Sequence, residues 1–461
     1  MRFLLALLIL ACWPSHAQSP GPGPEDGAAQ NSKETFWDRF WISLQANFIS
    51  QYHPAFPATY SGPNSFSPRS QDATSRVETL YTGFRIFNRL EILTDVESVG
   101  GAGLSDALGI AGFTNVDVVR NPSLSQDPYV ARAMLHYTIP LGKQFTDATR
   151  NPLSLASTVP VRRLELRAGK LSTVDFFDLN SVGSDSHLQF MNWTAVNNGA
   201  FDYAADTRGY TYGVVAELYD GQWAARFGEM LMPTVANGLV LDWDVARARG
   251  ENYEVEYHPE LLRKRSTVWR ALAFENHARM GLYRDAIDSY LAGKDPVPDI
   301  TLSRRQGRIK YGFGLNGEQE LTPLWRAFFR LGWNDGRTES FAYTEVDRTA
   351  AAGSDFRGTP WHRSQDKVGV AVVANGISGD HRRYLQLGGS GFLLGDGGLR
   401  YGLEKIFETY YTAHIWRGIS VAFDYQHVTD PGYNRDRGPV SVVGLRVHIE
   451  DAVPFGRFGR H

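Results

Sequence analysis

The sequence predicts a transmembrane antiparallel β-barrel of about 16 strands, an all-β fold with long outer loops and an inward-folded third loop. Three observations predict it. Apolar and polar residues alternate along many short segments, as in RLELRAGKL at 163–171. Asp220-Gly221 joins two such segments, and Asp-Gly is a strong hairpin signal because both turn positions require positive φ. A polar loop of 37 residues, 172–208, interrupts the wall and is long enough to fold inward and narrow a pore.

The strands are expected to cross the membrane in alternating directions, with short turns at one end and long loops at the other. Strands that run outward are expected near 41–51, 90–98, 161–171, 222–230, 266–277, 323–334, 383–393 and 418–428. Long outer loops are expected at 52–74, 99–127, 172–208, 231–250, 278–303 and 335–365. An even number of strands returns the C-terminus to the periplasmic side, so the barrel closes consistently.

Three segments show the alternation most clearly. One face of 309–315 carries Ile309, Tyr311, Phe313 and Leu315, and the segments 325–333 and 443–449 follow the same pattern. The opposite face of 325–333 includes Arg326 and Arg330, which places these two guanidinium groups in the lumen. One stretch departs from the period of two: 281–293 has apolar residues at helical spacing and is followed by Pro296, which predicts a short helix in the fifth loop.

The N-terminus predicts export. Arg2, the apolar run 3–11 and the small-x-small site Ser15-His16-Ala17 form a signal peptide over 1–17, cleaved near Ala17. We expect a periplasmic linker and short N-terminal segment over 18–40, the barrel over 41–450 and a C-terminal tail over 451–461. Cys12 is the only cysteine, so the mature chain has no disulfide and depends on burial or a closed sheet. A net charge of −3 gives no indication of nucleic-acid binding.

Three stretches resemble the carbohydrate-selective outer-membrane porins of Gram-negative bacteria: GAGLSDALGIAGFTN at 101–115, the segment 166–213, and HARMGLYRDAI at 277–287. The resemblance implies a sixteen-stranded barrel whose third loop helps form a constriction that passes small sugars. It also implies contact with outer-membrane lipid and lipopolysaccharide, and assembly by the barrel assembly machinery as a monomer or trimer. Such barrels commonly end in an aromatic residue, whereas this chain continues to His461, so we expect the final strand to end near Ile449.

A sugar-selective pore needs hydrogen-bond partners for hydroxyl groups and flat apolar faces for the sugar ring. The third loop and the lumen face of nearby strands supply both. We therefore expect the sugar-binding residues to be Arg163, Glu165, Arg167, Asp175, Asp178, Asn192, Trp193, Asn198, Asp202, Arg208, Arg226, Arg326 and Arg330. Two other interpretations stay open: turns favour Asp and Asn for their own sake, and lumen arginines also form ion-pair ladders that stiffen a polar interior.

No catalytic residue, cofactor or metal site is expected, because the sequence lacks the common hydrolase, phosphate-loop and zinc motifs. Calcium binding by the loop acids is an alternative, although no twelve-residue calcium loop occurs. A secreted or outer-membrane hydrolase acting on glycans or lipids is the main alternative function, with His187 close to Ser184 and Ser186. A structural barrel without an open lumen is a third possibility, which ion conductance would exclude.

Overall fold

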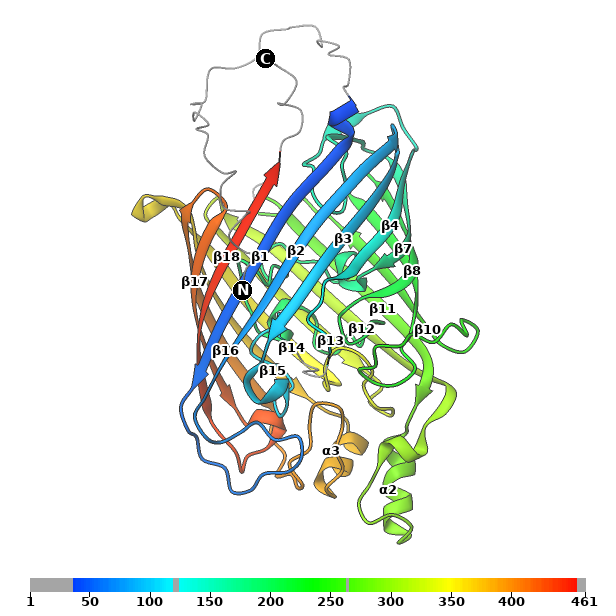
Figure 1. Ribbon diagram of the computed structural model, residues 1–461, viewed down its shortest axis with the longest axis vertical. Coiled ribbons are helices and arrows are strands. Elements are labelled where there is room, and N and C mark those ends of the chain that lie inside the picture. The colour runs from blue at the N-terminus through cyan, green and yellow to red at the C-terminus, as the bar shows by residue number, and fades with distance from the viewer. Residues whose placement is uncertain (1–35, 119–123, 263–264, 454–461) are drawn as a thin grey trace, which may run out of the picture. The chain divides into compact units, whose positions relative to one another are not determined.

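The computed structural model describes residues 36–118, 124–262 and 265–453, so the predicted signal peptide lies outside the described residues. Sixteen antiparallel strands close into a barrel (Figure 1). In chain order they are β1 Phe40–His53, β2 Gln71–Phe87, β3 Leu90–Gly101, β4 Tyr129–Pro140, β7 Arg163–Leu171, β8 Thr211–Asp220, β9 Trp223–Leu231, β10 Arg249–Tyr257, β11 Thr267–Met280, β12 Arg305–Thr322, β13 Trp325–Asn334, β14 Arg348–Gly358, β15 Arg363–Gly376, β16 Glu404–Trp416, β17 Ile419–Thr429 and β18 Val440–Val453. The predicted fold class and strand number are confirmed.

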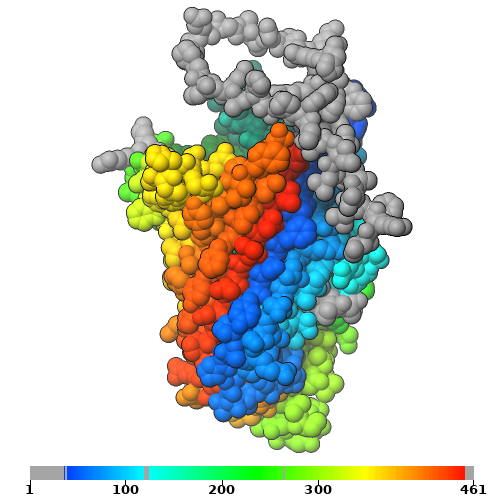
Figure 2. All heavy atoms as spheres, turned by 60° about the vertical axis from the view of Figure 1, so that its left-hand side comes forward, coloured from blue at the N-terminus to red at the C-terminus, as the bar shows by residue number. Residues whose placement is uncertain are grey.

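The first and last strands close the wall. β1 pairs with β18 in an antiparallel register that places Ala46 opposite Ile449, and the two strands lie side by side in Figure 2. β18 continues to Val453, which is beyond the Ile449 expected from the sequence. Closure leaves no free sheet edge, and a bilayer requires this because it offers no hydrogen-bond partner to an open edge.

The two faces of the wall differ in polarity as the alternation predicts. Leu315, Leu331 and Leu445 face outward and are about half exposed, at 50%, 47% and 51%. Large outward aromatic side chains collect at the short-turn end, where Trp223 stacks on Tyr257 with ring centroids 4.2 Å apart. Trp269, Trp325, Trp361 and Trp416 are exposed at the same end. An apolar band with a girdle of aromatic residues is the outer surface of a membrane-spanning barrel.

Long connections lie at one end of the barrel and short ones at the other (Figure 1). The long-loop end carries α2, Tyr283–Leu291, and α3, Gly379–Gln386. The remaining helices are α1 Trp193–Val196 and the short 3-10 turns η1 Phe36–Arg39, η2 Leu104–Ala107, η3 Thr173–Asp175, η4 Ile300–Ser303, η5 Thr359–Trp361 and η6 Pro431–Tyr433. α2 confirms the helix predicted in the fifth long loop. A hairpin of β5 Phe145–Asp147 and β6 Thr158–Pro160 fills the one extended connection at the short-turn end.

Two predicted elements are wrong. The outward strand expected at 383–393 is instead the end of α3 and a loop, and the outer loop expected at 335–365 contains all of β14. β14 was missed because its lipid face carries Ala350 and Ala352, whose small side chains give a weak alternation signal. α3 begins at a Ser378 cap, whose hydroxyl accepts a hydrogen bond from the His381 backbone N–H. The two errors cancel in the strand count and leave the topology at sixteen.

Much of the barrel interior is filled by the second and third long loops. The buried apolar cluster includes Phe113 of the second loop and Phe177, Phe190 and Phe201 of the third. These side chains pack against lumen-facing residues such as Phe274 and Phe328. Among the described residues, no helix is long and apolar enough to cross a membrane.

Candidate functional site: the constriction around the third loop

The third long loop lies inside the barrel because the wall satisfies its backbone. Glu408 of β16 accepts hydrogen bonds from the N–H groups of Met191 and Asn192, at 2.6 and 3.3 Å. Glu254 of β10 and Glu318 of β12 accept from the Asp178 and Ser181 N–H groups, at 2.8 and 2.9 Å. Buried N–H groups are costly unless they are paired, so these wall carboxylates stabilise the infolded loop.

Three predicted site residues form part of the same anchor. Arg330 is fully buried and lies with its Nε 3.1 Å from the Asp178 carboxylate. Its Nη1 donates to the Ala195 carbonyl at 2.7 Å, and its Nη2 donates to the Ser184 hydroxyl at 2.7 Å. Asp202 pairs with buried Lys310 at 3.1 Å. Arg330, Asp178 and Asp202 therefore fix the loop to the wall, whether or not a sugar also reaches them.

Two predicted asparagines also hold the third loop in place. The Asn192 side-chain oxygen accepts from the Thr194 N–H and so begins α1, while its Nδ2 donates to the Gly112 carbonyl at 2.6 Å. Asn198 donates to the Leu331 carbonyl at 3.2 Å. Trp193 is different: its Nε1 bonds the Asn115 carbonyl at 2.7 Å, but its ring also lines an open cavity.

A belt of alternating charge crosses the lumen face of β7 to β12 in the half nearest the short turns. Arg226 of β9 is its centre, with contacts of 3.1 Å to Glu217, 3.0 Å to Glu254 and 3.0 Å to Glu256. The belt also contains Arg163, Glu165, Arg167, Arg270 and Glu318. It contains four of the predicted site residues, namely Arg163, Glu165, Arg167 and Arg226. Arg326 lies beyond the belt and pairs with Asp355 at 3.0 Å.

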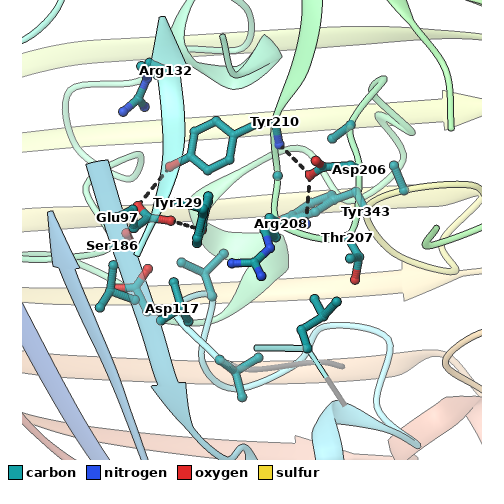
Figure 3. A pocket seen from close by; sticks show the side chains of 18 of the residues that line it. Glu97, Asp117, Tyr129, Arg132, Ser186, Asp206, Thr207, Arg208, Tyr210 and Tyr343 are labelled. Atoms are coloured by element: carbon teal, nitrogen blue, oxygen red, sulfur yellow. Dashed lines mark hydrogen bonds between the residues drawn. The ribbon is translucent and has the colours of Figure 1, made fainter. Parts of the chain in front are cut away.

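A cavity of about 300 Å³ lies between β2, β3 and the second and third loops (Figure 3). At its centre the Glu97 carboxylate accepts hydrogen bonds from the hydroxyl groups of Tyr129 and, at 2.9 Å, of Tyr210. The two tyrosine rings meet edge to face with centroids 6.4 Å apart. Aromatic surface therefore lies beside an oriented carboxylate, a combination that suits a ring with hydroxyl groups on its edge.

Cationic groups complete the cavity wall. The Arg208 guanidinium lies 3.8 Å from the centroid of the Tyr129 ring and donates to the Ser125 carbonyl at 3.1 Å. Arg132 is held by two contacts of 2.6 Å from the predicted site residue Asp175. The structure thus places Trp193, Arg208 and Arg132, the partner of Asp175, around one cavity.

Two loop carboxyls of this cavity have shifted pKa values. Burial raises the pKa of Asp206, although N–H groups of Tyr210 and Arg208 bond the carboxylate. Asp117 lies 3.3 Å from His187, which stacks on His448 with ring centroids 5.3 Å apart. Burial alone would raise the pKa of Asp117, but the neighbouring His187 outweighs it and the pKa is lowered. The same pair raises the pKa of His187 against the opposing effect of burial.

The core of this cavity, formed by Glu97, Tyr129, Arg132 and Tyr210, was not predicted from the sequence. One signal was available: Glu91, Asp95 and Glu97 recur at every second or fourth position of β3 and therefore face the lumen. Tyr129 and Tyr210 stand at strand–loop boundaries, and nothing in their local sequence indicates that they meet. Within the described residues, no group of three or more His, Cys, Asp and Glu side chains is placed to hold a metal ion.

A closed barrel with a lipid-facing exterior, a charged lumen and an infolded loop defines a porin, a non-enzymatic diffusion channel of the Gram-negative outer membrane. The profile of the carbohydrate-selective porin, OprB family, matches residues 76–450, and the chain belongs to that family. The protein is therefore an outer-membrane channel for sugars, and the hydrolase alternative is wrong. His187 contacts Asp117 and His448, while Ser184 bonds Arg330 and the Val196 carbonyl.

A solved porin structure shares the fold at low sequence identity. The high-pH structure of Pseudomonas putida OprB is 12% identical, with a TM-score of 0.69 over 90% of this chain and 94% of that one. The outer membrane channel DcaP of Acinetobacter baumannii is 10% identical, with a TM-score of 0.49 over 89% and 97%. No curated protein sequence matches the chain significantly.

Proposed function

We propose that small carbohydrates, from monosaccharides to short oligosaccharides, diffuse passively and with weak selectivity through the cavity between β2, β3 and the third loop. One observation carries this proposal: the loops fill the opposite side of the lumen, while this side keeps an open space lined by aromatic rings and oriented polar groups. Sugar rings stack weakly on aromatic faces and exchange hydrogen bonds with carboxylate and guanidinium groups. Weak, multiple contacts suit a channel because a deep trap would slow release.

Within this proposal the predicted residues have two roles. Trp193 and Arg208 contact the sugar directly, together with Glu97, Tyr129 and Tyr210. Asp178, Asn192, Asn198, Asp202 and Arg330 hold the constriction in shape, and Asp175 does so through Arg132. The belt residues Arg163, Glu165, Arg167 and Arg226 form the exit toward the periplasm, and Arg326 stands beside that exit. Tyr81, Tyr203 and Tyr343 add aromatic surface to the cavity.

Single-channel conductance in a planar bilayer, titrated with glucose and longer maltooligosaccharides, tests the proposal. Stepwise conductance that falls as sugar is added is expected for the wild type. Arg208→Gln removes a charge-assisted partner worth about 1.5–3 kcal/mol, so the sugar concentration for half block should rise about tenfold or more. Arg247→Gln is the matched control because Arg247 is exposed on another outer loop. Equal sugar block in the wild type and both variants would remove Arg208 from the site.

Export and assembly form a separate part of the proposal. The N-terminal residues predict cleavage near Ala17, and the resemblance implies insertion by the barrel assembly machinery. N-terminal sequencing of protein isolated from outer membranes checks the cleavage site, for which Gln18 is the expected first residue. Mass measurement of the purified channel in detergent separates a monomer from a trimer.

A further inference from the structure

The outward face of β13 to β17 is hollowed into a groove of about 580 Å³. Its floor is made of the small side chains Ala350, Ala352 and Ala374, and its rims are Phe329, Leu331 and Phe407. All of these positions belong to the half of the wall nearest the long loops, because β14 begins and β15 ends there. A groove of this size on the lipid-facing surface exposes apolar area that acyl chains can fill.

Two cations stand at the long-loop end of the groove. Lys405 lines the groove and lies opposite Ala374, while Arg348 lies two residues from Ala350 and opposite Trp333. Both side chains are exposed, and among the described residues neither has an ion-pair partner within 4.0 Å. Arg348 and Lys405 sit on strands two apart, so their backbones are separated by about 10 Å across the sheet.

The position of these cations matters because charge on a lipid face is costly in the middle of a bilayer and nearly free at its boundary. Trp333, directly opposite Arg348, belongs to the aromatic residues of the outer boundary. None of the residues that line the groove is a carboxylate, so nothing there neutralises Lys405. The groove therefore combines an apolar trough within the hydrocarbon region and a doubly positive end at the level of lipid headgroups.

We propose that this groove binds a phosphorylated, multiply acylated glycolipid of the outer leaflet. Its acyl chains lie over Ala350, Ala352 and Ala374, and its phosphate groups contact Arg348 and Lys405. Arginine and lysine at a membrane boundary attract anionic headgroups, and small floor residues allow the acyl chains close contact with the sheet. This inference concerns the outside of the barrel and does not depend on where sugars pass.

A second groove provides an internal comparison. It has a similar volume, about 610 Å³, and is lined by residues of β2, β3, β4, β7, β8 and β9 that include Leu135, Tyr137, Ala216 and Phe227. The only charged residue along it is Arg167, whose guanidinium points into the lumen and pairs with Glu217 and Glu165. A lipid attracted only by apolar area would bind both grooves, whereas a phosphorylated lipid prefers the groove beside Arg348 and Lys405.

Native mass spectrometry of the detergent-purified, full-length channel tests the proposal. The probes are a bis-phosphorylated hexaacyl lipid A, the same lipid without its phosphates, and phosphatidylcholine. The wild type is expected to retain lipid A preferentially. Arg348→Gln combined with Lys405→Gln should weaken lipid A binding about 30-fold, as two lost headgroup contacts predict. Ala352→Phe fills the trough and should weaken binding while both cations remain.

Two controls separate this site from general effects. Arg247→Gln with Lys294→Gln removes the same charge from exposed outer loops and should leave lipid A binding unchanged. Ala216→Phe fills the second groove and should also leave lipid A binding unchanged.

Equal binding of the lipid with and without phosphates, or full retention of lipid A by the Arg348/Lys405 double variant, would overturn the proposal. A groove variant that loses its oligomer mass but keeps its bound lipid would also overturn the proposal, because the groove would then be a contact between copies of the chain. Sugar block, measured in parallel, is expected to stay unchanged in every variant.

Discussion

Substitution of Arg330 by methionine separates an anchoring role from a sugar-contact role for a residue predicted to bind sugar. Met fills a similar volume but cannot donate hydrogen bonds. The wild-type guanidinium donates to the Ala195 carbonyl and the Ser184 hydroxyl, both at 2.7 Å, and lies 3.1 Å from the Asp178 carboxylate. Its loss leaves that carboxylate buried without its cation. Breaking a buried ion pair from one side costs about 3–5 kcal/mol, and we expect the variant to lose this much stability.

The free energy of unfolding in urea, measured on protein in lipid vesicles, checks that magnitude. Because Arg330 holds the third loop and not the barrel wall, we also expect a larger single-channel conductance and passage of longer sugars in Arg330→Met. Arg326→Met is the matched control for conductance: it also removes a lumen ion pair, with Asp355 of the wall at 3.0 Å, but Arg326 makes one contact with the loop, to the Ser181 hydroxyl at 3.1 Å. Weaker sugar block at unchanged conductance and unchanged stability would refute the anchor and support direct contact.

Three further predictions concern pH, loop docking and the lipid face. The neighbouring Asp117 raises the pKa of His187. The stability that this ion pair adds to the loop contact is therefore complete below the unfolded-state pKa of about 6.5 and is lost as pH rises through the raised pKa. Conductance should increase over that pH range in the wild type and not in His187→Gln. Glu404→Ala removes the acceptor of three backbone N–H groups, those of Ala111, Gly112 and Gly432. The free energy of unfolding in urea should therefore fall by about 3 kcal/mol or more. Leu315→Arg should lower the free energy of unfolding in vesicles by about 2–4 kcal/mol, whereas Thr429→Arg, near the outer boundary, should lower it by only about 0–1 kcal/mol. Equal losses of stability in the two variants would contradict the membrane placement.

At low pH the stability that the His187–Asp117 pair adds to the loop contact changes in the opposite direction, because it then depends on ionisation of Asp117. The pKa of Asp117 is lowered because the neighbouring His187 outweighs burial, so its contribution is present above the ordinary carboxyl value and is lost as pH falls through the lowered pKa. The contact between the second and third loops should therefore be strongest at intermediate pH. Conductance measured across the full range in Asp117→Asn, which removes the titrating carboxyl, provides the control.

The exterior of the barrel was predictable because it depends on local pattern. A period of two identifies the lipid face of β12, β13 and β18 with no knowledge of which strands pair, and a bilayer excludes any fold that leaves backbone groups unpaired. The prediction failed at β14 for the same reason: with Ala350 and Ala352 on its outer face, the local pattern is too weak to distinguish a strand from a loop. Small residues there also make the groove that we assign to lipid.

The sequence by itself determined the closed barrel, the lumen side of Arg163, Arg226 and Arg330, and the third loop as the segment that narrows the pore. Only the tertiary structure decided which polar groups hold that loop and which remain at the cavity. Glu97, Tyr129 and Tyr210 meet although they come from separate parts of the chain. Alternation fixes the face on which a side chain lies, but a partner across the lumen is set by how the loop packs, and this depends on contacts between residues far apart in the sequence.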